Sequence, residues 1–290
     1  MYYRNKFVSV FIYMFRISKR KEFNIMKKVG FLGAGNMGFA IMKGITGSSL
    51  KDISLYAFDI SEDLRKRAES IGVNVCSSEC NLVEKCDYVF LAVKPQVLSG
   101  VLETIKPVLS ADKVVVSIAA GISGEYLKTR TIPDLKAVLV MPNTPLLLGE
   151  GATALSKVEP TTDEEFALVC SIFGACGEYA VLSADKMKEI IAINGSSPAF
   201  IYLFAKAFIE YASEQGIDDE AAKKLFAKTL VGSAKMITDS GNTIDELIKM
   251  VSSPGGTTLA GLDRLYEGNL VQVVKNACDS CTKRAYELSE

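Results

Sequence analysis

The chain has 290 residues, 49% of them hydrophobic and 23% charged, which suits two globular domains and excludes wholesale disorder. Its net charge of −1 offers no general electrostatic attraction for nucleic acid. Histidine is absent, which excludes a Ser-His-Asp triad, a Cys-His dyad, a histidine-bearing metal site and an imidazole general base. We therefore expect no metal site, and catalysis that depends on a cofactor, hydroxyls, backbone dipoles, carboxylates or lysines.

Residues 1–25 differ from the rest of the chain, because basic residues surround a short apolar run at Phe7–Phe15. The run is too short to span a bilayer as a helix, and no signal-peptide cleavage site follows it. Met26 stands directly before the first predicted strand. We expect translation to begin at Met26, with 1–25 a leader that is not native or is disordered. A membrane-surface anchor is the alternative.

Apolar runs alternate with helical patterns over 26–185. Continuous apolar runs indicate strands buried on both faces, so this part predicts a doubly wound, Rossmann-like α/β domain. The predicted strands are Lys27–Leu32, Leu55–Phe58, Tyr88–Val93, Val114–Ile118 and Ala137–Met141, with outer strands at Gly151–Val158 and Glu178–Leu182. The predicted helices are Phe39–Ile45, Ser61–Ser70 and Asp163–Phe173.

Long helical patterns fill 186–290, which we expect to be an all-helical domain. Gly241 suits a helix C′ position, and Thr243-Ile-Asp-Glu246 is a capping-box pattern. Several helices are more apolar than a small monomer needs, which indicates an interface between subunits. The predicted helices are Pro198–Glu214, Asp219–Ser240, one opening at Thr243, one after Thr258, and Leu270–Glu287.

Seven cysteines form no regular disulfide framework, which favours a reducing cytoplasm over an export route. Cys278 and Cys281 have the spacing of a redox motif, but the same spacing is one helical turn. We interpret both as ordinary thiols.

A glycine-rich motif, Gly33-Ala-Gly-Asn-Met-Gly38, follows a predicted strand and opens a helix, as a dinucleotide-binding loop requires. Gly33 permits the tight turn, Gly35 lets the backbone approach a pyrophosphate, and Gly38 allows close helix–strand packing. Asn36 and Met37 lie at the helix N-terminus, whose amides attract an anion.

Asp59 ends the second predicted strand, 21 residues after Gly38. An acid at this place binds the adenosine ribose and favours NADH over NADPH. Ser61, Arg65 and Lys66 follow and could instead meet a phosphate, although a solvated helix face explains them better.

Two later strand ends also carry candidate coenzyme ligands, because the carboxyl ends of strands line the crevice of an open α/β sheet. Lys94 is placed there to meet a cofactor phosphate or ribose, and Asn143 lies in a loop stiffened by two prolines. Each motif could instead be a structural turn. The candidates at these ends are Ala92, Val93, Lys94, Pro95 and Asn143.

Two clusters of small residues, Asn194–Ala199 and Val251–Thr258, precede predicted helices. Such a loop presents unpaired backbone amides to an anion, and a carboxylate fits as well as a phosphate. Plain helix capping is the alternative for both clusters. The second cluster has two adjacent glycines and is the stronger candidate.

These motifs together resemble the pyrroline-5-carboxylate reductase family. The similarity runs in order from about Met26 to the C-terminus, and residues 1–25 have no counterpart. The first motif is shared by many dehydrogenases, whereas the last is close to diagnostic. The motifs are Phe31–Gly38, Ala92–Pro95, Met141–Pro145, Gly195–Ala199 and Ser252–Thr258.

The resemblance implies a Rossmann-like domain and a helical domain that interlocks with a partner subunit, in homodimers that often assemble into decamers. It implies reduction of Δ1-pyrroline-5-carboxylate to L-proline with NADPH or NADH, the last step of proline biosynthesis. It also implies a small-molecule substrate, no nucleic-acid or membrane partner, and a cytoplasmic enzyme.

The resemblance further assigns the site. Thr258 lies near the imine nitrogen as the catalytic hydroxyl, and Ala119 and Ala120 belong to a segment that meets the nicotinamide. Asn194 and Phe200 replace the more common Ser and Tyr, and Asp59 stands where many members have an uncharged or basic residue, so the coenzyme preference stays open. The loop that holds the substrate carboxylate is Ser253, Gly255, Gly256, Thr257 and Thr258.

Two alternatives remain at this point. Another imine or β-hydroxyacid dehydrogenase has the same layout, but β-hydroxyacid enzymes usually depend on a lysine near the start of the helical domain. Gly195–Ala199 has none, and the nearest lysine downstream is Lys206. A non-catalytic nucleotide sensor would not need the Ser253–Thr258 loop.

Overall fold

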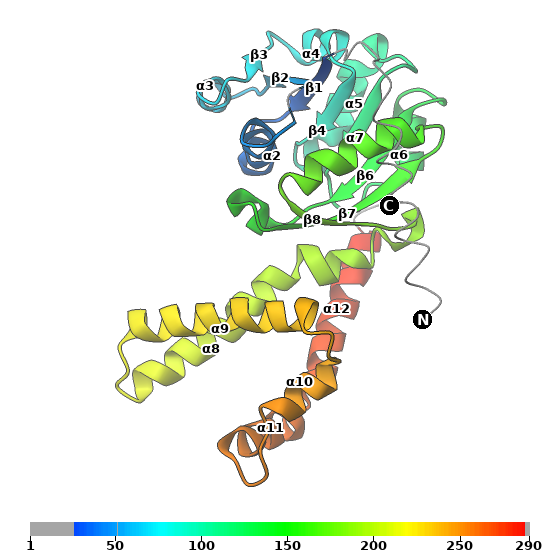
Figure 1. Cartoon of the computed structure of the whole chain (residues 1–290). Coiled ribbons are helices and arrows are strands. Elements are labelled where there is room, and N and C mark those ends of the chain that lie inside the picture. Colours follow the sequence, from blue (N-terminus) through cyan, green and yellow to red (C-terminus); the bar gives the residue numbers. More distant parts are fainter. Residues whose placement is uncertain (1–25, 51, 288–290) are drawn as a thin grey trace.

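The computed structural model describes residues 26–50 and 52–287, so the predicted leader at 1–25 lies outside the described residues. An α/β part is followed by helices that project from it (Figure 1). No helix in the described part of the chain is long and apolar enough to cross a membrane.

Eight strands of the described chain form one sheet in the order β3-β2-β1-β4-β5-β6-β7-β8. All neighbouring strands are parallel except β6 and β7, which are antiparallel. Because the strand order reverses beside β1, the sheet is doubly wound, as predicted. The strands are β1 (Lys27–Leu32), β2 (Ile53–Phe58), β3 (Asn74–Val75), β4 (Tyr88–Leu91), β5 (Val114–Ser117), β6 (Lys136–Met141), β7 (Gly151–Val158) and β8 (Gly177–Val181).

Helices cover both faces of the sheet, which explains why the strands are apolar on both sides. Phe31 and Phe90 stack with ring centres 4.5 Å apart, under Phe173 of α7. One face packs against α2, α3 and α7, and the other against α4, α5 and α6. These helices are α2 (Asn36–Thr46), α3 (Glu62–Glu69), α4 (Glu79–Lys85), α5 (Pro95–Ile105), α6 (Gly124–Arg130) and α7 (Asp163–Gly174).

The remaining helices form an arm beneath the sheet (Figure 1). Helices α8 and α9 pack side by side through Phe204, Phe208 and Phe226, and α12 returns to the α/β part. Large apolar side chains stay exposed along the arm, Leu203 and Leu225 at 68% each, which indicates a surface that another subunit covers. The helices are α8 (Ser197–Glu214), α9 (Asp219–Asp239), α10 (Ile244–Met250), α11 (Thr257–Glu267) and α12 (Leu270–Glu287).

The local predictions hold where a side chain or a glycine fixes the backbone. Ser61 caps α3, Thr243 and Glu246 form the predicted capping box, and Gly241 has a φ of 75° after α9. The third predicted strand was too long, because β4 ends at Leu91 and the chain then turns into α5. Strand β3 and helices α4, α5 and α6 were not predicted from the sequence.

Candidate active site

The glycine-rich loop joins β1 to α2 at the carboxyl edge of the sheet. Gly33 has a φ of 102°, a left-handed conformation that favours glycine. A Cβ atom at residue 38 would lie 2.4 Å from the Gly33 carbonyl oxygen and 3.2 Å from the Ala92 Cβ, so the close packing of α2 requires Gly38. A Cβ atom at residue 35 would meet no described atom within 4 Å.

Open space therefore lies beside Gly35, at the start of α2. No side chain caps the first turn of α2, and amides in a first turn lack intrahelical acceptors. Asn36 is exposed and Met37 is half-buried. These residues fit a dinucleotide pyrophosphate, because free amides and the helix dipole both favour an anion there.

Asp59 follows β2, and two backbone amides hold its carboxylate. Oδ2 accepts from the Ala34 amide at 2.8 Å, and Oδ1 accepts from the Ser61 amide at 2.9 Å. The side chain thus fixes the glycine-rich loop to the end of β2, a role that the sequence analysis missed. Each carboxylate oxygen can accept a further hydrogen bond, so a ribose hydroxyl can still bind.

The basic side chains beyond Asp59 already have partners. Arg65 Nη1 donates to the carbonyl oxygens of Asp59 at 2.6 Å and Ile60 at 3.2 Å, and Lys66 pairs with Glu62 on an exposed face. Neither of these two contacts the glycine-rich loop.

Arg67, which the sequence analysis did not single out, does contact that loop. It donates to Asn36 Oδ1 at 3.4 Å, and its guanidinium lies 3.8 Å from the centre of the Phe39 ring. The Arg67 side chain thus links helix α3 to the start of α2.

The other predicted coenzyme ligands follow β4, β5 and β6 at the same edge of the sheet. Lys94 is exposed at the N-cap of α5, directly before Pro95, while Ala92 and Val93 are half-buried. Ala119 is buried and Ala120 exposed after β5. Asn143 is buried after β6, and its Oδ1 accepts from the Ala152 amide at 2.9 Å.

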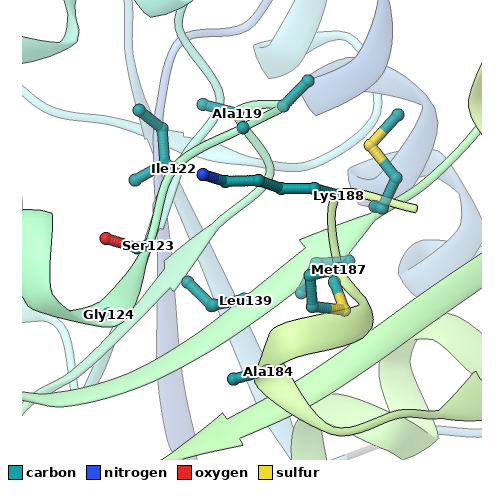
Figure 2. A pocket seen from close by; sticks show the side chains of 12 residues that line it. Ala119, Ile122, Ser123, Gly124, Leu139, Ala184, Met187 and Lys188 are labelled. Carbon is teal, nitrogen blue, oxygen red and sulfur yellow. The ribbon is translucent and has the colours of Figure 1, made fainter. Parts of the chain in front are cut away.

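Behind the loop Ala119–Gly124 lies a cavity of about 70 Å³ (Figure 2). The loop, the end of β6 and the connector that precedes α8 line it, and Lys188 extends across it toward the loop. Lys188 was not predicted as a site residue, and the irregular connector that carries it has no periodicity that would place it near a strand end.

Asn194 ties the connector to the sheet. Its Nδ2 donates to the carbonyl oxygens of Met141 at 2.7 Å and Ala152 at 3.0 Å, and the residue is 8% exposed. A serine, the more common residue at this place in the family resembled, has one hydroxyl proton and cannot donate to both oxygens. The departure at Asn194 therefore has a structural reason.

The Ser253–Thr258 loop lies far from this edge, where α10 meets α11 at the remote end of the arm (Figure 1). Gly255 has a φ of 71°, and no side chain caps the first turn of α11. Gly256 is half-buried, whereas Ser253, Thr257 and Thr258 are exposed. One chain therefore does not bring Thr258 to its own glycine-rich loop.

Comparisons with known proteins find two family models that match different parts of this chain. Residues 184–288 match the family description "Pyrroline-5-carboxylate reductase dimerisation", and residues 28–121 match "NADP oxidoreductase coenzyme F420-dependent". A pyrroline-5-carboxylate reductase of Arabidopsis thaliana is 36% identical over 265 residues, 91% of this chain and 96% of the relative. The reductase of Escherichia coli K12 is 34% identical over 91% of this chain and 99% of the relative.

The fold is shared as well. The crystal structure of Plasmodium falciparum pyrroline carboxylate reductase with NADP bound has a TM-score of 0.82 and 29% identity, and covers 93% of this chain and 100% of its own. With this identity to the curated relatives over nine-tenths of its length, the chain belongs to the pyrroline-5-carboxylate reductase family.

Proposed function

We propose that this chain reduces the C=N bond of Δ1-pyrroline-5-carboxylate to L-proline with NADPH or NADH, the final step of proline biosynthesis. The observation that carries the proposal is family membership over 91% of the chain, from the glycine-rich loop through the Ser253–Thr258 loop. Turnover of either reduced coenzyme with pyrroline-5-carboxylate, followed by nicotinamide absorbance on protein started at Met26, supports it. Coenzyme binding without turnover overturns it.

The proposed coenzyme site is the carboxyl edge of the sheet. The first-turn amides of α2 bind the pyrophosphate, and Asp59 binds the adenosine ribose. When bound, the reduced nicotinamide supplies a hydride for the C=N carbon. The proposed coenzyme ligands are Gly33, Gly35, Asn36, Met37, Gly38, Asp59, Ala92, Val93, Lys94, Pro95, Ala119, Ala120 and Asn143.

The proposed substrate site is the loop between α10 and α11. Backbone amides of Ser253–Thr257 hold the substrate carboxylate, in the way that free amides at a helix start hold anions. The Thr258 hydroxyl, or a water that it positions, hydrogen-bonds the imine nitrogen and supports its protonation. A cyclic imine can be protonated near neutral pH, so a chain without histidine meets the chemical demand.

We infer that the complete site forms between two subunits. The Thr258 loop lies far from the coenzyme edge of its own chain, and the exposed apolar arm that carries it is the part that matches a dimerisation domain. A partner chain can therefore bring its Thr258 to this chain's coenzyme edge. Assembly of such dimers into decamers is a further proposal, based on the family resemblance.

Subunit complementation tests this inference. Gly38→Ala and Thr258→Ala proteins, each nearly inactive, are mixed, dissociated and reassembled. Random reassembly makes half of the dimers heterodimers, and one of the two sites in each heterodimer combines an intact coenzyme edge with an intact Thr258 loop. About a quarter of the wild-type sites is therefore restored. If the mixture stays as inactive as its components while native mass spectrometry shows mixed dimers, each site belongs to one chain.

The coenzyme preference should respond to Asp59. Asp59→Asn keeps an acceptor for a backbone amide but removes the charge that repels a 2′-phosphate. We expect the NADPH-to-NADH ratio of kcat/KM to rise about tenfold, the effect of about 1.4 kcal/mol. Asp59→Ser should shift the ratio in the same direction and also weaken both coenzymes, because the Ala34 and Ser61 amides lose their acceptor. An unchanged ratio in both variants would show that Asp59 only braces the loop.

We also propose a cytoplasmic location, which the seven unpaired cysteines support because a reducing compartment keeps thiols free. The proposed domain limits are 26–185 for the dinucleotide-binding part and 186–290 for the helical part.

A further inference from the structure

The end of α12 contacts the loop that follows β5. A Cβ atom at residue 121 would lie 3.3 Å from the Ala285 carbonyl oxygen, and Ala285 is 5% exposed. Gly121 also has a φ of 80°, which favours glycine. The backbone of the helix end therefore packs directly against the loop Ala119–Gly124, which belongs to the proposed coenzyme edge.

Side-chain contacts between α12 and the connector before α8 stabilise this packing. The Tyr286 hydroxyl, at the end of α12, donates to Glu189 Oε1 at 2.8 Å. Lys188 Nζ lies 4.3 Å from the centre of the Tyr286 ring, within the range of a cation–π interaction. The hydrogen bond to Glu189 holds the pKa of the Tyr286 phenol above its usual value, so the hydroxyl remains a donor at neutral pH.

The Tyr286 hydroxyl is the hydrogen-bond donor to the Glu189 carboxylate. The other carboxylate oxygen, Oε2, is buried and has no hydrogen-bond partner in the described part of the chain. Among the described residues, the carboxylate is therefore hydrogen-bonded through Oε1 alone. Glu189 itself is only half-buried and its bond to Tyr286 is exposed, so we give this contact the weight of one ordinary hydrogen bond.

Lys188 connects the same contact to the loop from the other side. Its side chain lines the cavity behind Ala119–Gly124 and extends toward the loop (Figure 2). It also lines a second cavity together with Ser123 and Tyr286. The loop is thus held between the end of α12 and the Lys188 side chain.

We propose that Lys188, Glu189 and Tyr286, here called the α12 clasp, are positioning residues that hold the loop Ala119–Gly124 in the shape that binds the nicotinamide. This proposal rests on the proposed function only in naming the nicotinamide as the ligand of the loop. Helix α12 also presents Val271, Val273 and Val274, each about half exposed, near its other end. The clasp therefore joins the coenzyme edge to a helix whose apolar surface belongs to the dimerisation part.

The test compares Tyr286→Phe with Tyr179→Phe in the full assembled protein. Tyr286→Phe keeps the ring under Lys188 and removes only the hydroxyl. Tyr179 is equally exposed at 44%, and its hydroxyl has no hydrogen-bond partner among the described residues, so it is the matched control. Amide hydrogen exchange of residues 119–124, the NADH dissociation constant and kcat are measured for each variant.

We expect Tyr286→Phe to speed exchange at 119–124 and to weaken NADH binding, each about fivefold, the factor expected for one lost hydrogen bond. kcat at saturating coenzyme should change much less, because the clasp touches no reacting atom. Tyr179→Phe should leave all three values at wild type. Glu189→Gln combined with Tyr286→Phe should add little to Tyr286→Phe alone, because both changes remove the same contact.

Unchanged exchange at 119–124 in Tyr286→Phe, or faster exchange confined to the end of α12, overturns the clasp. An equal effect of the control tyrosine overturns it as well. A wild-type protein that binds NADH but does not reduce pyrroline-5-carboxylate overturns the proposed function instead, because the exchange and binding responses remain measurable without turnover.

Discussion

Thr258→Ala should lower kcat/KM for pyrroline-5-carboxylate by up to about 100-fold, the lower range for the loss of one positioned proton donor. The dissociation constant of the coenzyme should stay near wild type, because Thr258 is exposed at the remote end of the arm, away from its own glycine-rich loop. Steady-state kinetics and a coenzyme titration by nicotinamide fluorescence measure both quantities.

The control for this change is Thr258→Ser, which keeps a hydroxyl on the same carbon. It should recover most of the lost kcat/KM, because the hydrogen bond to the imine nitrogen needs the hydroxyl rather than the methyl group. If Thr258→Ala keeps wild-type kcat/KM, Thr258 has no role in the chemical step. If Thr258→Ser is as impaired as Thr258→Ala, the methyl group and not the proton donor matters.

Gly38→Ala should strongly weaken coenzyme binding and destabilise the α/β part. The new Cβ would lie 2.4 Å from the Gly33 carbonyl oxygen, and backbone cannot give way as a side-chain tip can. Relieving the overlap moves α2 away from β4, at a cost of about 1–3 kcal/mol. If the same strain opposes coenzyme binding, the dissociation constant rises about 10- to 100-fold.

Gly35→Ala separates the effect on coenzyme binding from the effect on fold stability. A Cβ atom at this position meets nothing within 4 Å in the chain itself, so the thermal unfolding temperature should stay close to wild type. Coenzyme binding should still weaken, because the methyl group occupies the space where the pyrophosphate approaches. If Gly35→Ala binds coenzyme normally, the dinucleotide does not lie against this loop, and the proposed edge is wrong.

The sheet was predictable because its strands are buried on both faces and therefore read as continuous apolar runs. Lys27–Leu32 and Gly151–Val158 are observed with the predicted limits. The short helices α4 and α6 were missed, because seven residues give too little periodicity to separate from a loop. β4 ends before Ala92, although Ala92 and Val93 continue the apolar run, because Pro95 starts α5.

The side-chain contacts around the candidate site were less predictable. Asp59 was singled out as a ribose ligand, and nothing in its spacing indicates that it also binds the Ala34 amide. Asn194 looked like a departure from the family, and only its two carbonyl partners explain it. Lys188 and Tyr286 lie 98 residues apart in the sequence, so their contact depends on α12 returning to the sheet.

The sequence by itself determined the chemistry of this protein. The absence of histidine excludes imidazole chemistry. The Gly33–Gly38 and Ser252–Thr258 loops together indicate an oxidoreductase that depends on a coenzyme, because both loops act through local backbone geometry. Only the tertiary structure decided where the two loops lie. It places the first at the carboxyl edge of the sheet and the second at the remote end of the arm (Figure 1). The helices of this arm leave large apolar side chains exposed instead of burying them in a core. That arm needs a second subunit, and so does the active site that we propose.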